Sequence, residues 1–178
     1  MDFHIIPECY VDTTLIETIV PPKIGYNHQM GCPNVAKKMT EDKFLKDDFA
    51  LGIIDKDKKE IEYAKLFEEI ADRNQLKLLK HPNKHHYFIV IIPAMEKWIM
   101  HNAEEVGVNL SDYDLPNDFE MLKKQSKSTK TKKDDRFRRL FKALKKQEAS
   151  GVMLLMAWIN YLKEHPYDAD LDFFRYDM

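Results

Sequence analysis

The chain has 178 residues, of which 44% are hydrophobic and 33% are charged, and its formal net charge is −2 at pH 7. This composition is typical of one globular domain with its own hydrophobic core, and it excludes a disordered chain. The apolar runs are far shorter than the roughly 18 residues that cross a membrane, and the start lacks the basic region of a signal peptide. We therefore expect a cytoplasmic protein without a membrane partner. Cys9 and Cys32 form no CxxC pair, which favours free thiols.

The first part of the chain predicts alternating strands and helices. An apolar segment at residues 3–7 predicts a strand that ends at Pro7, because proline has no N–H group for the sheet. Helical spacing of apolar residues predicts a helix over residues 11–19, and Pro33 favours the start of a second, short helix. Residues 49–54 form an apolar run of the kind found in strands buried on both faces of a parallel sheet.

The pattern continues toward the middle of the chain. Residues 61–71 place apolar side chains at helical spacing, so we expect an amphipathic helix there. Strands are predicted at residues 76–80 and 87–92, and a helix at residues 94–105. This order predicts an α/β fold with a mainly parallel central sheet flanked by helices.

Three histidines lie in the connector between the last two predicted strands: His81, His85 and His86. Zinc binding is one interpretation of this group. Solvated or hydrogen-bonding imidazoles are the alternative, because no cysteine is nearby in the sequence.

The chain becomes strongly basic after the predicted helices. Residues 123–146 contain twelve lysine or arginine residues and two aspartates, a net charge of +10. Residues 125–131 predict a loop, whereas residues 136–146 predict an amphipathic helix with Phe137 and Leu140 facing inward. A solvated lysine-rich surface is one interpretation, and contact with nucleic-acid phosphates is the other. The candidate nucleic-acid contacts are Lys127, Lys130, Lys132, Lys133, Arg136, Arg138 and Arg139.

We expect two parts in the chain. Residues 1–110 would form the α/β core, and residues 111–178 a basic, mostly helical extension packed on that core. Within the extension, residues 152–163 are apolar almost all round, which predicts a buried helix. The last helices would therefore form a C-terminal cap.

Carboxylates follow the predicted strands where these end. Glu8 follows the first strand, and Asp55 and Asp57 follow the central one. Open α/β sheets bind ligands beyond the carboxyl ends of their strands, and carboxylate oxygens are preferred ligands of Mg²⁺. Asp55 and Asp57 are therefore candidate ligands of Mg²⁺ or Mn²⁺, with a solvated loop as the alternative. Glu96 lies in the first turn of a predicted helix, where it either complements the helix dipole or acts catalytically.

The order of these residues resembles the Toprim fold of topoisomerases, primases and the overcoming-lysogenization-defect nucleases. Glu8-Cys9-Tyr10-Val11-Asp12 is similar to the family's Glu-Gly-x-x-Asp, with Cys9 where glycine is usual. Asp55-x-Asp57 resembles its metal-binding pair, and Pro93-Ala94-Met95-Glu96 its proline-then-acidic segment. The resemblance covers about residues 3–105.

The resemblance implies a Mg²⁺-dependent nuclease in microbial defence or a mobile element. Glu8, Asp55 and Asp57 would bind the metal and act in catalysis with Glu96, and Asp12 would be a supporting acid. The alternative is a non-catalytic Toprim-like module that binds nucleic acid or protein. DNA or RNA is the expected partner, alongside a protein partner or a second copy of the chain.

Overall fold

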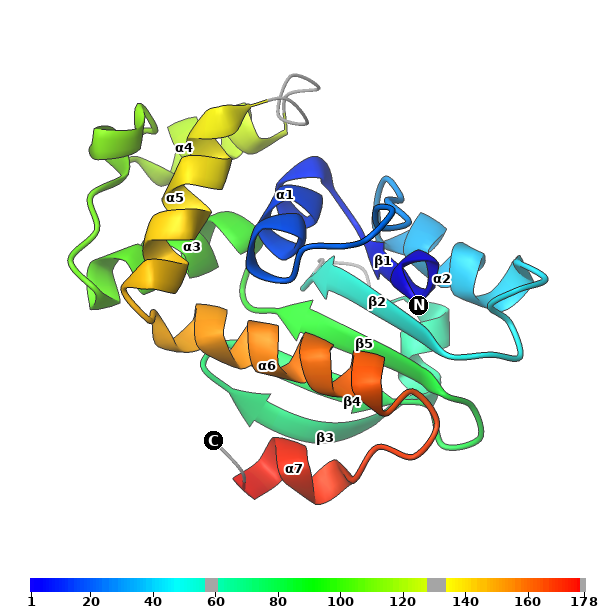
Figure 1. Cartoon of the computed structure of the whole chain (residues 1–178). Helices are drawn as coiled ribbons and strands as arrows, with labels where there is room; N and C mark the ends of the chain where they lie inside the picture. Colours follow the sequence, from blue (N-terminus) through cyan, green and yellow to red (C-terminus); the bar gives the residue numbers. More distant parts are fainter. Residues whose placement is uncertain (57–60, 128–133, 177–178) are drawn as a thin grey trace.

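The computed structural model describes residues 1–56, 61–127 and 134–176, and within them the chain forms a five-stranded sheet flanked by helices (Figure 1). The predicted α/β class is confirmed. Four of the predicted site residues lie outside the described residues: Asp57, Lys130, Lys132 and Lys133.

The sheet is mixed, not mainly parallel as predicted, and its strand order is β1-β2-β5-β4-β3. Strands β1 (Ile5–Pro7), β2 (Ala50–Asp55) and β5 (His86–Ile91) are parallel to one another. Strand β4 (Leu76–Lys80) is antiparallel to β5, and β3 (Glu68–Arg73) is antiparallel to β4. The parallel half therefore has all its carboxyl ends at one edge.

The helix predicted over residues 61–71 is wrong. A short 3-10 helix, η2 (Glu62–Leu66), leads directly into strand β3. A β-bulge lies between Glu69 and Ala71, and it places Ile70 and Ala71 in the same apolar cluster although they are neighbours in the chain. Two consecutive apolar residues on one face imitate a helical period, because a regular strand would alternate them.

A tight turn makes the antiparallel half of the sheet possible. Asn74 and Gln75 join β3 to β4 with φ angles of 47° and 60°. Positive φ at both central residues is typical of a two-residue hairpin turn whose twist matches that of the strands. The hairpin turns the chain back, so β3 becomes an edge strand of the sheet.

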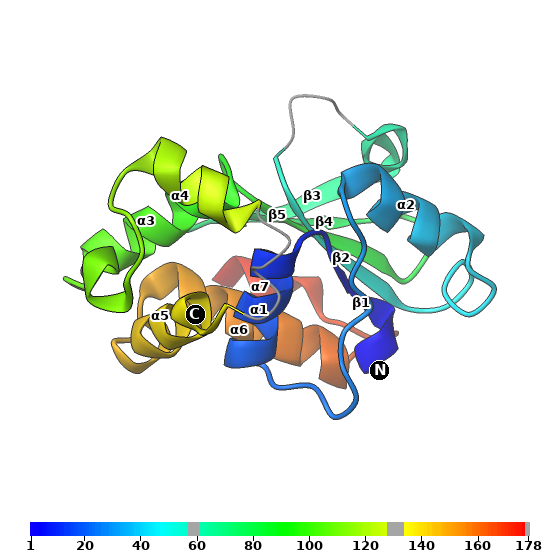
Figure 2. The ribbon, with the colours of Figure 1, turned by 90° about the horizontal axis from the view of Figure 1, so that it is seen from above.

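Helices cover both faces of the sheet (Figures 1 and 2). Helices α1 (Tyr10–Ile19), α6 (Ser150–Glu164) and α7 (Leu171–Tyr176) lie on one face, and α2 (Cys32–Glu41) lies on the other with η2. The remaining helices gather beyond the arrowheads of β2 and β5 in Figure 1; they are α3 (Met95–Glu105), α4 (Phe119–Ser126) and α5 (Asp135–Lys146). The short helices η1 (Asp2–His4) and η3 (Leu110–Tyr113) complete the described elements.

The basic extension contributes to the main hydrophobic core. Phe137, Leu140 and Phe141 of α5 are fully buried in the same cluster as the apolar residues of α1 and the sheet. Helix α5 matches the predicted helix, with Arg138 and Lys142 exposed. Helix α4 continues to Ser126, so the loop predicted to begin at residue 125 begins later than expected. Leu122 and Ser126 are buried, and this burial favours the longer helix. In the described parts of the chain, no helix is long and apolar enough to cross a membrane.

Candidate functional site

The parallel strands bring Glu8 and Asp55 into direct contact at the carboxyl edge of the sheet. The backbone N–H of Glu8 donates to the carbonyl of Ile53 over 3.0 Å, which continues the β1–β2 ladder by one residue. The backbone N–H of Asp55 then donates to Oε2 of Glu8, also over 3.0 Å. The two predicted ligands are therefore neighbours in space. The register between the parallel strands β1 and β2, which are far apart in the sequence, brings them together.

Asp12 lies in the first turn of α1 and is only 1% exposed. Its Oδ2 accepts a hydrogen bond from the backbone N–H of Cys9 over 3.1 Å, and its own N–H donates to Sγ of Cys9 over 3.5 Å. This pair of contacts is a capping box in which cysteine takes the place of serine or threonine. Burial, followed by the charges of Asp55 and Glu8, raises the pKa of Asp12 well above its usual range. Its Oδ1 has no hydrogen-bond partner among the described residues.

Asp55 is the most perturbed carboxylate at the end of a strand. Burial and then the charge of Glu8 raise the pKa of Asp55 to about 7, although the backbone N–H of Met95 and the charge of Lys127 act in the opposite direction. Oδ1 of Asp55 is buried and, in the described part of the chain, has no hydrogen-bond partner. The carboxyl group is therefore able to gain or lose a proton near neutral pH.

Glu96 joins the same edge from the first turn of α3. It is 6% exposed, and the Ser126 hydroxyl at the end of α4 donates a hydrogen bond to its Oε1. The charge of Glu96 contributes to the raised pKa of Asp55. Lys127, which directly follows Ser126, lowers that pKa. Part of the basic segment (residues 123–146) therefore lies beside the acidic edge, by which we mean the carboxyl ends of the parallel strands with Glu8, Asp12, Asp55 and Glu96.

Cys32 is a site residue that the sequence did not indicate. Its thiol is 2% exposed and donates to Oε2 of Glu8 over 2.7 Å. The preceding residue, Gly31, has a φ of 85° and its N–H donates to the carbonyl of Glu8 over 3.3 Å, so the chain turns sharply there into α2. The Gly-Cys-Pro start of a helix was visible in the sequence, but nothing in it pointed to Glu8.

The donor set is suitable in kind for Mg²⁺ but incomplete in the described residues. Carboxylate oxygens are the ligands that Mg²⁺ prefers, and Oδ1 of Asp12 and Oδ1 of Asp55 have no hydrogen-bond partner among the described residues. Across residues 1–56, 61–127 and 134–176, no three His, Cys, Asp or Glu side chains are grouped to hold a metal ion. Glu8 and Asp55 therefore form a partial set, and Asp57 is the predicted residue that would complete it.

The histidines of the β4–β5 connector have other roles in the described structure. Nδ1 of His86 lies 2.6 Å from the Tyr63 hydroxyl, and Nε2 lies 2.9 Å from the carbonyl of Leu45. Nδ1 of His81 accepts from the N–H of Asn83 over 3.1 Å. Both nitrogens of His86 are thus used in hydrogen bonds, which favours the structural interpretation over zinc.

The arginines of α5 differ in their contacts with the other described residues. Arg136 binds Asp134 over 2.7 Å and the carbonyl of Asp114 over 2.8 Å, and Arg139 binds the Asp114 carboxylate over 3.0 Å. Arg138 is exposed and lines a hollow of about 380 Å³ with Lys142. Among the described residues of the predicted nucleic-acid surface, Arg138 and Lys127 are therefore the cations most available to a phosphate.

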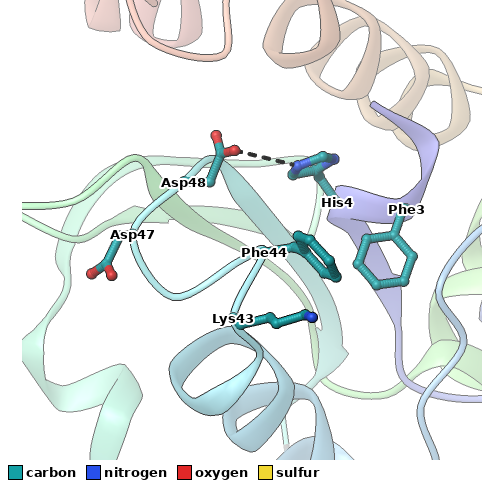
Figure 3. A pocket seen from close by; sticks show the side chains of 6 residues that line it. All are labelled: Phe3, His4, Lys43, Phe44, Asp47 and Asp48. Carbon is teal, nitrogen blue, oxygen red and sulfur yellow. Dashed lines mark ion pairs between the residues drawn. The ribbon is translucent and has the colours of Figure 1, made fainter.

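A larger hollow of about 660 Å³ lies at the opposite, amino edge of the sheet (Figure 3). Phe3 and Phe44 contribute its apolar wall, and Asp48 points toward His4 in Figure 3, with a separation of 3.7 Å between Oδ2 and Nε2. The Tyr167 hydroxyl donates to Asp48 over 2.5 Å and lowers the pKa of that carboxyl. Hydrogen bonding therefore stabilises the ionised form of Asp48, whereas the pKa values of Asp12 and Asp55 at the carboxyl edge are raised.

Comparison of the chain with protein-family models, with curated proteins and with solved structures gives no significant match.

Proposed function

We propose that this chain is a Toprim-like protein that cleaves phosphodiester bonds in nucleic acid with the help of Mg²⁺ or Mn²⁺. The observation that supports this most is the meeting of Glu8, Asp12, Asp55 and Glu96 at one edge of the parallel strands. Burial, together with their mutual repulsion, raises the pKa of Asp12 and Asp55. A divalent cation would relieve that repulsion, since hard cations bind carboxylate oxygens.

Glu8 and Asp55 would hold the ion together with Asp57. The bound cation would supply a hydroxide nucleophile near neutral pH and neutralise charge that develops on the phosphate. The Cys32 thiol and the Asp55 N–H fix the orientation of the Glu8 carboxylate. In the metal-free protein, burial and then the charge of Glu8 raise the pKa of Asp55 to about 7, and a bound cation would instead favour its ionised form.

The two remaining acids have supporting roles in the proposal. Asp12 closes the first turn of α1 through Cys9, which holds the end of β1 in place next to Glu8. Glu96 accepts a hydrogen bond from Ser126 and so holds the end of α4 at the acidic edge. Through this contact the segment that begins with Lys127 starts where a polyanion would have to approach the carboxylates.

The basic segment would bind phosphates without sequence preference. Lys127 and Arg138 are the described contacts that we propose, and Lys130, Lys132 and Lys133 would extend the surface. Arg136 and Arg139 would mainly hold α5 against the η3 region, because each already has an acidic partner.

A second candidate function is a non-catalytic Toprim-like module that binds nucleic acid or a protein. The observation that favours it is the hydrogen bond from Cys32 to Glu8, which occupies an oxygen that a metal would otherwise use. Cys9 at the position where the family has glycine favours the same alternative.

Cleavage of labelled single-stranded and duplex DNA and RNA, with Mg²⁺, Mn²⁺ or chelator, tests the proposal. Asp55→Asn and Glu8→Gln should each reduce cleavage by about 100-fold or more, since each removes a proposed ligand charge. Asp112→Asn, an exposed carboxylate on η3, is the matched control and should leave cleavage unchanged. Mn²⁺ binding measured by electron paramagnetic resonance gives an independent readout. Nucleic-acid binding without metal binding or cleavage would favour the module instead.

A further inference from the structure

A separate cavity of about 310 Å³ opens on the α2 face of the sheet and shares residues with the acidic edge. Asp55 and Cys32 line it, and both also contact Glu8. The cavity therefore lies directly beside the proposed site of cleavage, on the side away from Asp12 and α1.

Adjacent strands build the floor of this cavity, which is mainly apolar. Ile54 of β2 pairs with Val90 of β5, and Val90 pairs in turn with Lys77 of β4. All three side chains line the cavity, so they form one row across the sheet. Neighbouring strands are about 4.8 Å apart, so the row spans about 10 Å, the length of a planar ring system.

Lys77 contributes its hydrocarbon stem to the floor because its ammonium group is held elsewhere. Nζ of Lys77 binds Glu69 over 2.7 Å and Asp72 over 3.0 Å, both on β3. Ala64 of η2 lines the cavity from the opposite side, and its small side chain leaves the space open. Lys56, which is exposed and directly follows β2, adds a positive charge to the lining.

We propose that this cavity binds the base of one unpaired nucleotide, next to the phosphate that meets the acidic edge. The inference rests on the proposed function and names its substrate class as single-stranded nucleic acid or a frayed strand end. The volume is near the lower limit of about 300 Å³ for ligand sites, which suits one base and excludes a base pair. The strand residues of the floor offer aliphatic groups to a ring face, so the cavity would favour no particular base.

The direct test is a titration of the full chain with adenosine monophosphate in the absence of divalent cations, followed by amide NMR. Shifts should concentrate at Ile54, Ala64 and Val90. The affinity for a short single-stranded oligodeoxyadenylate should exceed that for the same sequence in a duplex. Shifts elsewhere but not at these residues, or equal affinity for the duplex, would overturn the cavity as a base site.

Ala64→Trp fills the cavity and should weaken oligonucleotide binding by about tenfold, the order expected when the apolar contact of one ring is lost. Gln147→Trp adds a ring of the same size at the exposed end of α5 and serves as its control. The wild-type titration decides the question if Ala64→Trp does not fold. Mg²⁺-dependent cleavage without shifts at the cavity would refute the base site alone. Shifts at the cavity without cleavage or metal binding would refute the proposed function alone.

Discussion

The thiol of Cys32 donates a hydrogen bond to Oε2 of Glu8 over 2.7 Å and thereby joins the start of α2 to the end of β1. The same oxygen accepts the backbone N–H of Asp55. One carboxylate oxygen thus receives donors from two segments that follow it in the chain by 24 and 47 residues. The orientation of the Glu8 carboxylate is therefore fixed only when β1, β2 and α2 are assembled.

Cys32→Ala should lower the free energy of unfolding by about 1–3 kcal/mol, because the variant leaves the half-buried Glu8 carboxyl group with one donor fewer. Cys32→Ser keeps a donor at this position and should lose less. Urea denaturation of both variants measures the difference. Equal stability of Cys32→Ala and the wild type would mean that the contact contributes nothing to folding.

The raised pKa of Asp55 predicts that the metal-free protein loses stability as the pH rises. The unfolded carboxyl ionises near pH 3.9, whereas the folded one remains protonated up to about pH 7. Between these values the folded state binds more protons, so the free energy of unfolding falls with increasing pH and then levels off. Asp12, whose pKa is also raised, contributes in the same direction.

Asp55→Asn cannot ionise, so it should flatten this dependence and raise the melting temperature at about pH 8 relative to the wild type. Melting curves by circular dichroism between about pH 5 and about pH 8, with chelator, measure the effect. Asp112→Asn, on the exposed surface of η3, should follow the wild type throughout. A wild type that gains stability with rising pH would contradict the buried, repelling carboxylates.

Gly52→Ala should destabilise the fold by about 1–3 kcal/mol, the usual cost of overpacking a core. A Cβ atom at Gly52 would meet Cε1 of Phe88 at 2.5 Å and Cγ1 of Val35 at 3.0 Å, between β5 and α2. Gly107→Asn is the control, because its φ of 66° suits asparagine and nothing lies within 4 Å of the added Cβ. Urea denaturation compares the two. A neutral Gly52→Ala would mean that α2 and β5 can separate freely.

The basic segment predicts a steep salt dependence of nucleic-acid binding. The logarithm of the affinity for duplex should fall with the logarithm of salt concentration by about 0.9 per neutralised phosphate. Replacing Lys130, Lys132 and Lys133 by glutamine should flatten the slope without changing any sequence preference. Fluorescence anisotropy at several salt concentrations measures both. An unchanged slope would identify the segment as a solvated surface.

Local patterns in the chain predicted four of the five strands and most of the helices, but not the mixed topology of the sheet. The apolar run ending at Asp55 predicted a buried strand because strands buried on both faces have no polar side to alternate. The period of Phe137 and Leu140 predicted α5 because one helix face is buried. The same reasoning failed at Ile70, where a bulge, which depends on the partner strand, placed neighbouring residues on one face.

The sequence by itself determined the strand ends at which Glu8 and Asp55 lie, since each follows its own apolar run. Only the tertiary structure decided that these ends meet, because the register of parallel strands depends on contacts between segments far apart in the chain. It also decided the proton affinity of Asp55, because burial and neighbouring charges arise only when β1, β2 and α3 are assembled. The role of Cys32 also depends on the tertiary structure. Its thiol reaches Glu8 because α2 packs against the sheet, and no local sequence pattern encodes that packing.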